Sequence, residues 1–574
     1  MKHYLPFESR YDKFPTTRIV GHSAYQGYEN LINELSNSLK KSRVTCFEMY
    51  PGVDEKEVRV NLIDKLGFDE IYDISKCAKS IEDIDKMIQL FLTDDRIFGI
   101  MSKFLIEAFY DADKLAKLRE TISKSNKKVA VYGFGASQIA HDKLVYFDIT
   151  RWEIQLRFRK GMPNWLCTNY DEDPLRKYKR GYFIEWRTAD RLKKLVLPQA
   201  DYYVDTNKEN DPKMVTGKAL FCAFKDISIK PFRLVPYFDP GVWGGQWMKE
   251  VCQLDADKIN YAWSFDGVPE ENSLLFNFNG ISLETPAINL VFFESVNLLG
   301  SRVYGRFGHE FPIRFDFLDT FEGQNLSLQV HPLIQYVQDK FGMTFTQDES
   351  YYILDAKDDA AVYLGIKDSV KKEDLRKALT DDQEGKAKFE AEKFITKYPA
   401  KKHDHFLIPA GTVHCSCTNC MVLEISATPY IFTFKLYDWE RVGLDGRPRA
   451  INIEHGMNNI QFDRDEKWVR DNLINDFVEM DDGSTKTGLH EREFIETRRH
   501  YFENKILMKT YGSVNMNNLV EGESAIIESV NGEFEPYEIH YAETFIIPGS
   551  IKEYYIKPGK PGMKCGVLKA YVRG

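Results

Sequence analysis

Apolar residues follow two different patterns along the chain, and the pattern changes near residue 230. In the first part, segments with helical periodicity at residues 29–40 and 80–92 alternate with short apolar runs. These runs are predicted strands at residues 44–47, 129–132, 144–147 and 202–204. Alternating helices and strands are typical of a parallel α/β sheet. Residues 1–230 are therefore predicted to form an α/β domain.

From residue 231 onward, short aromatic and β-branched runs are separated by Gly, Pro and Asn, which is the pattern of sandwich or jelly-roll sheets. The predicted strands lie at residues 273–278, 288–293, 327–330, 351–354, 422–425 and 431–437. A segment rich in Lys, Glu and Ala at about residues 369–397 predicts one small helical insertion.

A short internal repeat indicates two jelly rolls in tandem. The run FLIPAG at residues 406–411 recurs as FIIPGS at residues 545–550. His414 follows the first proline by five residues, whereas Glu553 follows the second. We therefore expect one jelly roll at residues 231–470, equipped to bind metal, and a second without metal ligands at residues 471–574.

Charge and composition limit the class of function. The chain has 574 residues, which exceeds the size of a single hydrophobic core. Its formal net charge of −10 argues against nucleic-acid or anionic-membrane partners, which require a basic face. No segment resembles a signal peptide or an apolar membrane span, so we expect a cytoplasmic protein whose nine cysteines are reduced thiols.

The segment SLQVHP contains the first part of a predicted metal site. Because side chains two apart on a strand share a face, Gln329 and His331 are expected to project together. Glu349 and His414 can add a carboxylate and a second imidazole. Two histidines, one carboxylate and a neutral oxygen leave open positions on a divalent ion, as a catalytic site requires.

Cys415, Cys417 and Cys420 follow His414 closely. A thiolate zinc site is one interpretation, but the spacing lacks a second cysteine pair. Alternating packing residues on a strand are the favoured interpretation.

Several motifs in residues 231–574 resemble those of type I phosphomannose isomerases of the cupin superfamily. The motifs are PYFDPGVWGG, QVHP, DESYYILDA, IPAGTVH, LEIS and FKLYDW. The resemblance implies a multidomain α+β protein in which tandem cupin (β jelly-roll) domains follow the α/β domain. It also implies one zinc ion held by Gln329, His331, Glu349 and His414, and interconversion of mannose 6-phosphate and fructose 6-phosphate.

Two positions depart from the pattern of that family. Gln347 stands where a lysine is usual, and Lys435 stands where an arginine is usual. Lysine keeps the charge but not the planar fork of arginine. Lys435 and Glu424 are the candidate catalytic residues, the second as a proton relay. The candidates for binding the substrate phosphate are Arg441 and Arg447, with Arg449, Arg302 and Arg306 as further possibilities.

Two alternative functions remain open at this point. One is a non-catalytic sugar-phosphate sensor, in which Gln347 and Lys435 mark lost catalysis. The other is a non-haem iron oxygenase, because two histidines and a carboxylate also suit iron. The Gln-x-His start counts against the oxygenase.

In the first 230 residues, DITRWE at residues 148–153 follows a predicted strand and ADYYVD at residues 200–205 lies near the end. This order of segments resembles that of nucleoside-kinase-like P-loop domains, in a degenerate form. Residues 129–137 read as a strand entering a glycine turn, but Gln138 breaks the G-x-G-x-x-G pattern. The place of a phosphate-binding loop, after residues 44–47, reads EMYPGVD and lacks the Gly-Lys-Ser/Thr signature. A regulatory or assembly role is the favoured interpretation.

Overall fold

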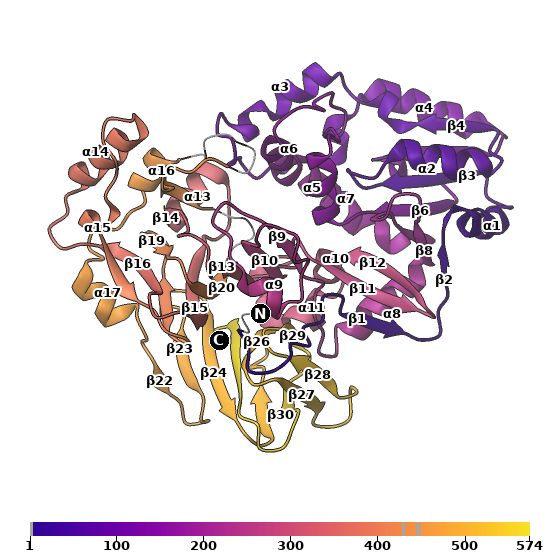
Figure 1. Ribbon diagram of the computed structural model, residues 1–574. Helices are drawn as coiled ribbons and strands as arrows, with labels where there is room; N and C mark the ends of the chain where they lie inside the picture. Colours follow the sequence, from indigo (N-terminus) through magenta and orange to yellow (C-terminus); the bar gives the residue numbers. More distant parts are fainter. Residues whose placement is uncertain (1–3, 428–429, 431, 444–445, 447–448, 450) are drawn as a thin grey trace. The chain divides into compact units, whose positions relative to one another are not determined.

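The computed structural model describes residues 4–427, 430, 432–443, 446, 449 and 451–574. The chain forms two compact units (Figure 1). The parallel-sheet unit contains Thr16–Ile227 and Ser273–Phe293, and the sandwich unit contains Met1–Pro15, Ser228–Asn272 and Glu294–Gly574. The chain therefore passes between the units after residues 15, 227, 272 and 293, whereas the sequence pattern changes only once.

The parallel-sheet unit is built around a seven-stranded sheet of order β2-β8-β7-β6-β3-β5-β4, in which β4, β5, β3, β6 and β7 run parallel. The strands are β2 Ala24–Gln26, β3 Val44–Met49, β4 Glu70–Asp73, β5 Val129–Gly133, β6 Lys143–Asp148, β7 Tyr202–Asp205 and β8 Lys213–Thr216. The helices are α1 Tyr28–Ser38, α2 Glu55–Asn61, α3 Ile81–Leu92, α4 Ala112–Lys124, α5 Arg151–Arg159, α6 Pro174–Arg180, α7 Trp186–Val196 and α8 Gly217–Ile227.

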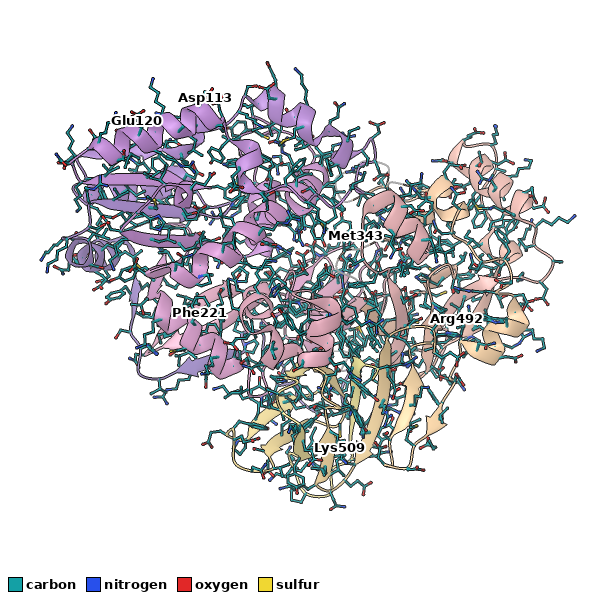
Figure 2. The ribbon with its side chains drawn as sticks, turned by 180° about the vertical axis from the view of Figure 1, so that it is seen from behind. Asp113, Glu120, Phe221, Met343, Arg492 and Lys509 are labelled. Atoms are coloured by element: carbon teal, nitrogen blue, oxygen red, sulfur yellow. The ribbon has the colours of Figure 1, made fainter. Side chains whose placement is uncertain are left out.

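The strands and helices predicted within residues 29–204 agree with the observed elements of this unit. Every residue of β3 is buried, as expected for a central strand covered on both faces. On α4, Asp111 caps the first turn while Leu115 and Ile122 are buried. Asp113 and Glu120 lie on the opposite, solvent-facing side of α4 (Figure 2). The amphipathic pattern therefore places this helix on the surface of the unit.

A second, three-stranded sheet completes the parallel-sheet unit and corrects one prediction. β1 (Thr16–Ile19) pairs in parallel with β11 (Ser273–Phe278), which pairs with β12 (Ile281–Pro286). The predicted strand at residues 288–293 is wrong, because this segment forms helix α10 (Ile288–Phe293). Its sequence, INLVFF, is apolar without a polar alternation, so periodicity cannot separate a buried strand from a buried helix.

The first β-sandwich of the other unit contains a six-stranded sheet of order β18-β15-β20-β13-β10-β9 and a five-stranded sheet of order β17-β16-β19-β14-β21. From β13 to β16, and from β18 to β21, successive strands alternate between the two antiparallel sheets, as in a jelly roll. The strands are β9 Tyr237–Asp239, β10 Trp263–Gly267, β13 Arg314–Asp319, β14 Leu328–Val330, β15 Asp348–Ala356, β16 Ala361–Ile366, β17 Ile395–Pro399, β18 His405–Ile408, β19 His414–Ser416, β20 Cys420–Ala427 and β21 Phe434–Tyr437.

Short helices flank the first sandwich. They are α9 Trp247–Val251, α11 Ser295–Leu299, α12 Ser301–Phe307, α13 Ile334–Phe341, α14 Lys372–Gln383, α15 Ala391–Phe394, α16 Ile453–Met457 and α17 Glu466–Asn472. The predicted helical insertion at about residues 369–397 is correct for α14 and α15. Its last residues instead begin strand β17, because residues 395 and 398 are buried against the sheet.

The second β-sandwich contains a six-stranded sheet of order β29-β26-β31-β24-β23-β22 and a four-stranded sheet of order β25-β30-β27-β28. Buried apolar side chains from both sheets form one core, which includes Phe502, Leu519, Ile527, Phe545 and Ile556. The strands are β22 Val478–Glu479, β23 Thr485–Gly488, β24 Ile495–Phe502, β25 Ile506–Lys509, β26 Asn515–Glu521, β27 Ser524–Ser529, β28 Tyr537–His540, β29 Thr544–Ile547, β30 Glu553–Pro558 and β31 Cys565–Val572.

None of the helices in the part of the chain that the structure describes has the length and apolar character needed to cross a membrane.

Candidate metal centre

Two facing sheets bring together the histidines and the carboxylate of the predicted metal site. His331 follows β14 directly, His414 begins β19 on the same sheet, and Glu349 lies on β15 of the opposite sheet. Nε2 of His331 is 3.0 Å from Oε2 of Glu349, and Nε2 of His414 is 2.8 Å from Oε1. All three side chains are fully buried. Among the described residues, they form a group whose ligand atoms can all reach one metal ion.

Backbone carbonyls fix the protonation of both imidazole rings. Nδ1 of His331 donates to the carbonyl of Phe432 at 2.8 Å, and Nδ1 of His414 donates to the carbonyl of Thr412 at 2.9 Å. Because the proton of each neutral ring is then on Nδ1, the lone pair of each Nε2 points toward Glu349. This is the tautomer that a metal-binding histidine requires.

Two glutamines extend the site. The amide nitrogen of Gln329 is 3.1 Å from Nε2 of His414, so a half-turn of the amide would present its oxygen to the same point. Gln347 donates to Oε2 of Glu349 at 3.0 Å and accepts from the amide of Phe432 at 3.0 Å. Gln347 therefore holds the carboxylate and the loop that orients His331.

The buried polar atoms at this site fit a divalent cation. Nε2 of His331 and Oε1 of Glu349 have no well-directed hydrogen bond among the described residues. Burial alone would raise the pKa of Glu349, but His331 and His414 hold it well below its usual range. Burial opposes protonation of His331, and the carboxylate of Glu349 outweighs it, so the pKa of His331 is raised. A divalent ion would satisfy these nitrogen and oxygen lone pairs together.

Glu424 lies on the inner face of the same sheet as Glu349. It is opposite Tyr351 on β15 and Asp316 on β13. Burial and the carboxylates of Glu349 and Asp316 raise the pKa of Glu424 well above its usual range. Arg314 forms an ion pair with Asp316, and burial raises the pKa of Asp316 to about 6. The interior thus holds an acid able to carry a proton next to the metal group.

Lys435 lies on β21 directly opposite Gln329 on β14. Opposite residues on neighbouring strands project to the same face, so Lys435 is on the side of the sheet that carries Gln329. Its half-buried position suits a cation at the rim of the site. Trp439, which follows the strand, has a left-handed backbone with φ of 55° and so does not continue this face.

The candidate phosphate-binding arginines have different surroundings. Arg441 pairs with Asp438 and donates to the carbonyl of Asn325 at 2.7 Å, and Arg449 is 2.9 Å from the same Asp438 carboxylate. These contacts engage both guanidinium groups within the protein. Arg447 lies outside the described residues.

Two further arginine candidates lie on α12. Arg302 donates to the carbonyl of Val572 at 2.8 Å, and the guanidinium of Arg306 lies over the rings of Phe307 and Phe494. Because both guanidinium groups already contact neighbouring protein groups, these contacts do not favour either arginine as a phosphate ligand.

Sequence reasoning missed Arg464. Its Nη1 donates to the carbonyls of Pro409 and Ala410 at 2.7 and 2.8 Å, and it also contacts the hydroxyl of Thr412. The turn that it holds carries the carbonyl that orients His414. Arg464 lies fifty residues beyond this turn, and no sequence motif connects them. Arg314 and Asp316 were also missed. Because they alternate with Phe315 and Phe317 along a strand, the sequence does place the two polar side chains on one face of the sheet.

The three clustered cysteines are packing residues in this structure. Cys415, Cys417 and Cys420 are buried, and burial raises the pKa of each thiol. Sγ of Cys415 donates to the carbonyl of Leu326 at 3.0 Å. Neutral, hydrogen-bonded thiols of this kind are unreactive.

In the parallel-sheet unit, a carboxylate occupies the glycine turn that follows β5. Oε1 of Glu48 accepts from the amide of Gly135 at 2.6 Å, and Oε2 accepts from the amide of Ser137 at 2.7 Å. Glu48 is 1% exposed, at the carboxyl end of β3. The amides that could bind a phosphate are therefore satisfied within the chain.

A buried His-Glu-His group between the two sheets of an antiparallel sandwich defines the sandwich unit as a candidate metal-binding jelly-roll protein. Comparisons with known proteins give two separate results. Residues 27–229 match a family described as a domain of unknown function, DUF8485. The rest of the chain is similar to proteins of another kind.

These relatives carry the name mannose-6-phosphate isomerase. The probable mannose-6-phosphate isomerase GmuF of Bacillus subtilis is 24% identical over 330 residues, which cover 57% of this chain and 96% of GmuF. The mannose-6-phosphate isomerase of Streptococcus mutans is 26% identical over 232 residues, which cover 40% of this chain and 67% of the relative. The crystal structure of the mannose 6-phosphate isomerase from Bacillus subtilis aligns with a TM-score of 0.48 at 20% identity, covering 60% of this chain and 99% of that one.

Proposed function

We propose that the sandwich unit is a metal-dependent aldose–ketose isomerase that interconverts mannose 6-phosphate and fructose 6-phosphate. The proposal rests on one observation. His331, Glu349 and His414 lie together, fully buried, in the part of the chain that is similar to named isomerases. Neither a hydride acceptor nor a phosphate donor is needed, since the reaction moves one proton from carbon 2 to carbon 1 and one from oxygen 2 to oxygen 1. Cupin-type architecture and zinc as the metal belong to this proposal.

His331, His414, Glu349 and Gln329 would hold the ion. When bound, a divalent ion supplies Lewis-acid stabilisation of the oxygens that become negative during enolisation. The protein residues then have three tasks, which are to orient the sugar, to move the proton and to bind the phosphate.

Glu424 is proposed to move the proton between carbon 2 and carbon 1 of the sugar. Burial and the neighbouring carboxylates raise its pKa, which makes Glu424 a stronger base than an ordinary carboxylate and so suits it to accept a proton from carbon. Lys435 is proposed to place its ammonium beside the reacting oxygens, where a fixed positive charge lowers the barrier to enediol formation. The phosphate is proposed to contact Arg441 and Arg447, as the sequence predicts.

A non-catalytic sugar-phosphate sensor is the second candidate. The observation in its favour is that Gln347, a neutral amide, contacts Glu349 at a position where the resembled family usually has a lysine. Such a protein would keep the metal and the sugar site without turnover. A non-haem iron oxygenase is the remaining alternative for two histidines and a carboxylate.

The deciding experiment uses the full chain, stripped of metal and reloaded with Zn²⁺. Formation of fructose 6-phosphate from mannose 6-phosphate is followed in a coupled assay, and binding is measured on the same sample. Zinc-dependent turnover supports the isomerase, while saturable binding without turnover supports the sensor. Iron without zinc in the purified protein, together with oxygen consumption, would replace both with the oxygenase.

A further inference from the structure

The second sandwich repeats the strand order of the first. Its six-stranded sheet runs β29-β26-β31-β24-β23-β22, which corresponds strand by strand to β18-β15-β20-β13-β10-β9. The repeated FLIP and FIIP segments place β18 and β29 at the same edge. This correspondence allows the interiors of the two sandwiches to be compared position by position.

The register assigns a counterpart to the carboxylate of the metal site. Glu349 pairs with Ile408 of the first repeat, and Asn515 pairs with Ile547 of the second. Asn515 therefore occupies the place of Glu349. Tyr554 lies opposite Met508, near the start of β30. Its side chain points inward and belongs to the core of the second sandwich.

The charged positions next to this one have opposite signs in the two sandwiches. The corresponding inward residues are Glu424 and Lys569, Asp316 and Arg498, and Arg314 and Glu496. The first interior therefore has an excess of carboxylates, which suits a cation. In the second, Lys569 and Arg498 lie beside Glu496, and Arg498 also pairs with Asp482 at 3.1 Å, so this interior does not repeat the carboxylate cluster of a cation site.

Polar atoms in the second interior lack partners. Lys569 is fully buried, and its ammonium donates to the carbonyl of Lys509 at 3.0 Å. Nε2 of His500, Oδ1 of Asn515 and the hydroxyl of Tyr554 are buried and have no hydrogen-bond partner in the described parts of the chain. Such atoms in a native interior indicate bound water or ligand polar groups.

Tyr511 separates this interior from the surface. Its ring centre lies 4.8 Å from the ammonium of Lys569. Tyr511 has φ of 56° and Gly512 has φ of 67°, and the amide of Ser513 donates to the carbonyl of Thr510 at 3.2 Å. A bulky residue with positive φ is strained, because its Cβ crowds the backbone, and tight turns of this kind favour Asn or Gly at that position. Strained backbone positions of this kind cluster at binding sites.

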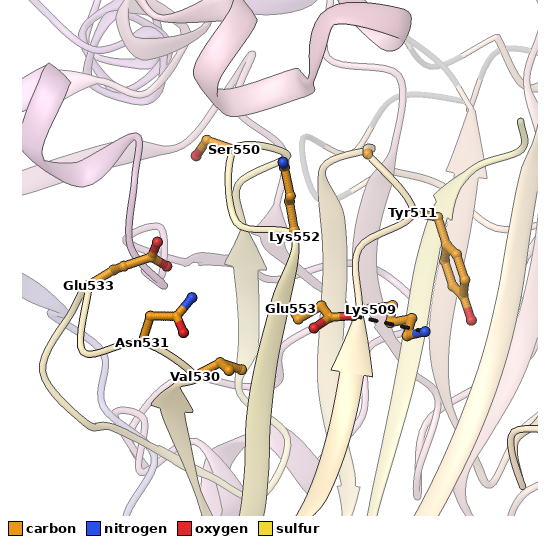
Figure 3. A pocket seen from close by; sticks show the side chains of 9 residues that line it. Lys509, Tyr511, Val530, Asn531, Glu533, Ser550, Lys552 and Glu553 are labelled. Carbon is orange, nitrogen blue, oxygen red and sulfur yellow. Dashed lines mark ion pairs between the residues drawn. The ribbon is translucent and has the colours of Figure 1, made fainter.

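A pocket of about 510 Å³ opens on the outer side of Tyr511 (Figure 3). It lies at the same end of the sandwich as the metal group does in the first, at the end of β25 and the start of β30. Its lining consists of Lys509, Tyr511, Gly512, Val530, Asn531, Glu533, Ser550, Lys552 and Glu553. The ammonium of Lys509 is 3.9 Å from the carboxylate of Glu553, which is too far for a hydrogen bond.

We propose that this pocket binds a small hydroxylated anion, either a sugar phosphate or a sugar acid. Lys509 and Lys552 contact the anionic group. Burial lowers the pKa of Lys569 to about 7, so an anion bound nearby would favour the ammonium form of this lysine. Asn531 and Glu533, which also line the pocket (Figure 3), hold sugar hydroxyls. The pocket is a second site, independent of the metal group and of the proposed isomerase activity.

The test uses the full chain with the metal removed by chelation, repeated with His414→Ala, so that the first site contributes no binding. Isothermal titration is carried out with mannose 6-phosphate, gluconate and inorganic phosphate. We expect one saturable site per chain for at least one of the two sugar anions. The ratio of the Kd for mannose 6-phosphate to the Kd for gluconate distinguishes a sugar phosphate from a sugar acid. Saturable binding of inorganic phosphate alone contradicts recognition of hydroxyls.

The double variant Lys509→Met/Lys552→Met should raise the Kd about tenfold or more. Both are surface lysines, so thermal unfolding should match the wild type. Lys560→Met, which removes an exposed lysine of the same sandwich that pairs with Glu523, is the matched control and should leave the Kd unchanged. Equal binding by the double variant, or absence of saturable binding to all three probes, overturns the proposal.

Discussion

Nε2 of His414 lies 2.8 Å from Oε1 of Glu349, although β19 and β15 belong to opposite sheets of the first sandwich. The metal group is therefore complete only when the two sheets are packed together. Metal binding at such a site is coupled to folding of the whole sandwich, because the unfolded chain does not hold the ligands close.

Removal of either histidine should remove the metal. His331→Ala and His414→Ala each delete an Nε2 ligand, so the bound metal should fall from about one ion per chain to a small fraction of that value. Elemental analysis after dialysis measures it. His403→Ala, which deletes a histidine that contacts Glu521 instead, is the control and should keep the metal. A fully metallated His414 variant would show that the site is misassigned.

Lys435→Ala should separate metal binding from turnover. The lysine is opposite Gln329 but is not expected to be a ligand, so the metal content should stay at the wild-type level. The kcat for mannose 6-phosphate isomerisation should fall about a hundredfold, because a positive charge beside the developing oxygen charge is lost. Lys435→Arg should recover part of it. Unchanged kcat in the alanine variant would exclude a catalytic role.

Arg464→Met should weaken metal binding without touching a ligand. Arg464 holds the turn whose Thr412 carbonyl accepts from Nδ1 of His414. Loss of such support typically lowers metal affinity about 10- to 100-fold. Competition with a chelator of known affinity measures the change, and Arg464→Lys should restore part of it.

The control for Arg464 is Arg470→Met, on the exposed side of α17. Its contact with Glu466 is 4.0 Å long, so this variant should retain wild-type metal affinity. Equal affinities for the Arg464 and Arg470 variants would mean that the turn keeps its shape without the guanidinium.

The parallel-sheet unit should lose stability as the pH rises from 5 to 8. Burial raises the pKa of Glu48 to about 7, so the folded unit binds a proton that the unfolded chain has already released. For one such group the free energy of unfolding should fall by roughly 2 to 3 kcal/mol over this range. Hydrogen exchange of the β3 amides, corrected for intrinsic rates, measures it.

Glu48→Gln should reduce that dependence by the share of one group, because the buried Glu55 and Glu284 of the same unit also have a pKa of about 7. Asp142→Asn is a matched control, because the Asp142 carboxylate also accepts from two backbone amides, those of Arg43 and Val44. These amides lower the pKa of Asp142, so its contribution to the free energy of unfolding is lost only in acid. The Asp142→Asn variant should therefore keep the wild-type slope between pH 5 and 8. An unchanged slope in the Glu48 variant would assign the effect to other groups.

The metal group was predictable because its residue types carry a chemical signature. Alternation placed Gln329 and His331 on one face, and the IPAGTVH turn identified His414. Arg464 was not predictable, since its contacts depend on a loop that returns to the first sandwich after β21. Glu48 was read as part of a degenerate loop, and only the three-dimensional turn shows that its carboxylate satisfies the amides of Gly135 and Ser137.

The fold was predictable where local patterns decide it. The central strands of the parallel sheet and the sandwich strands have short apolar runs with clear boundaries. The helix at Ile288–Phe293 was not, because a hexamer with one polar residue, Asn289, has no readable period. The parallel pairing of β1 with β11 joins residues more than 250 positions apart, and no local signal reports such a pairing.

Because residues 273–293 belong to the parallel-sheet unit while the chain on both sides of them belongs to the sandwich unit, the two units are interleaved in synthesis. A ribosome that has released only the first 227 residues has not yet supplied β11, β12 and α10, so this unit must wait for a segment made later. For the same reason, a protease that cuts once near residue 228 would leave each unit with a portion of its fold on the other fragment.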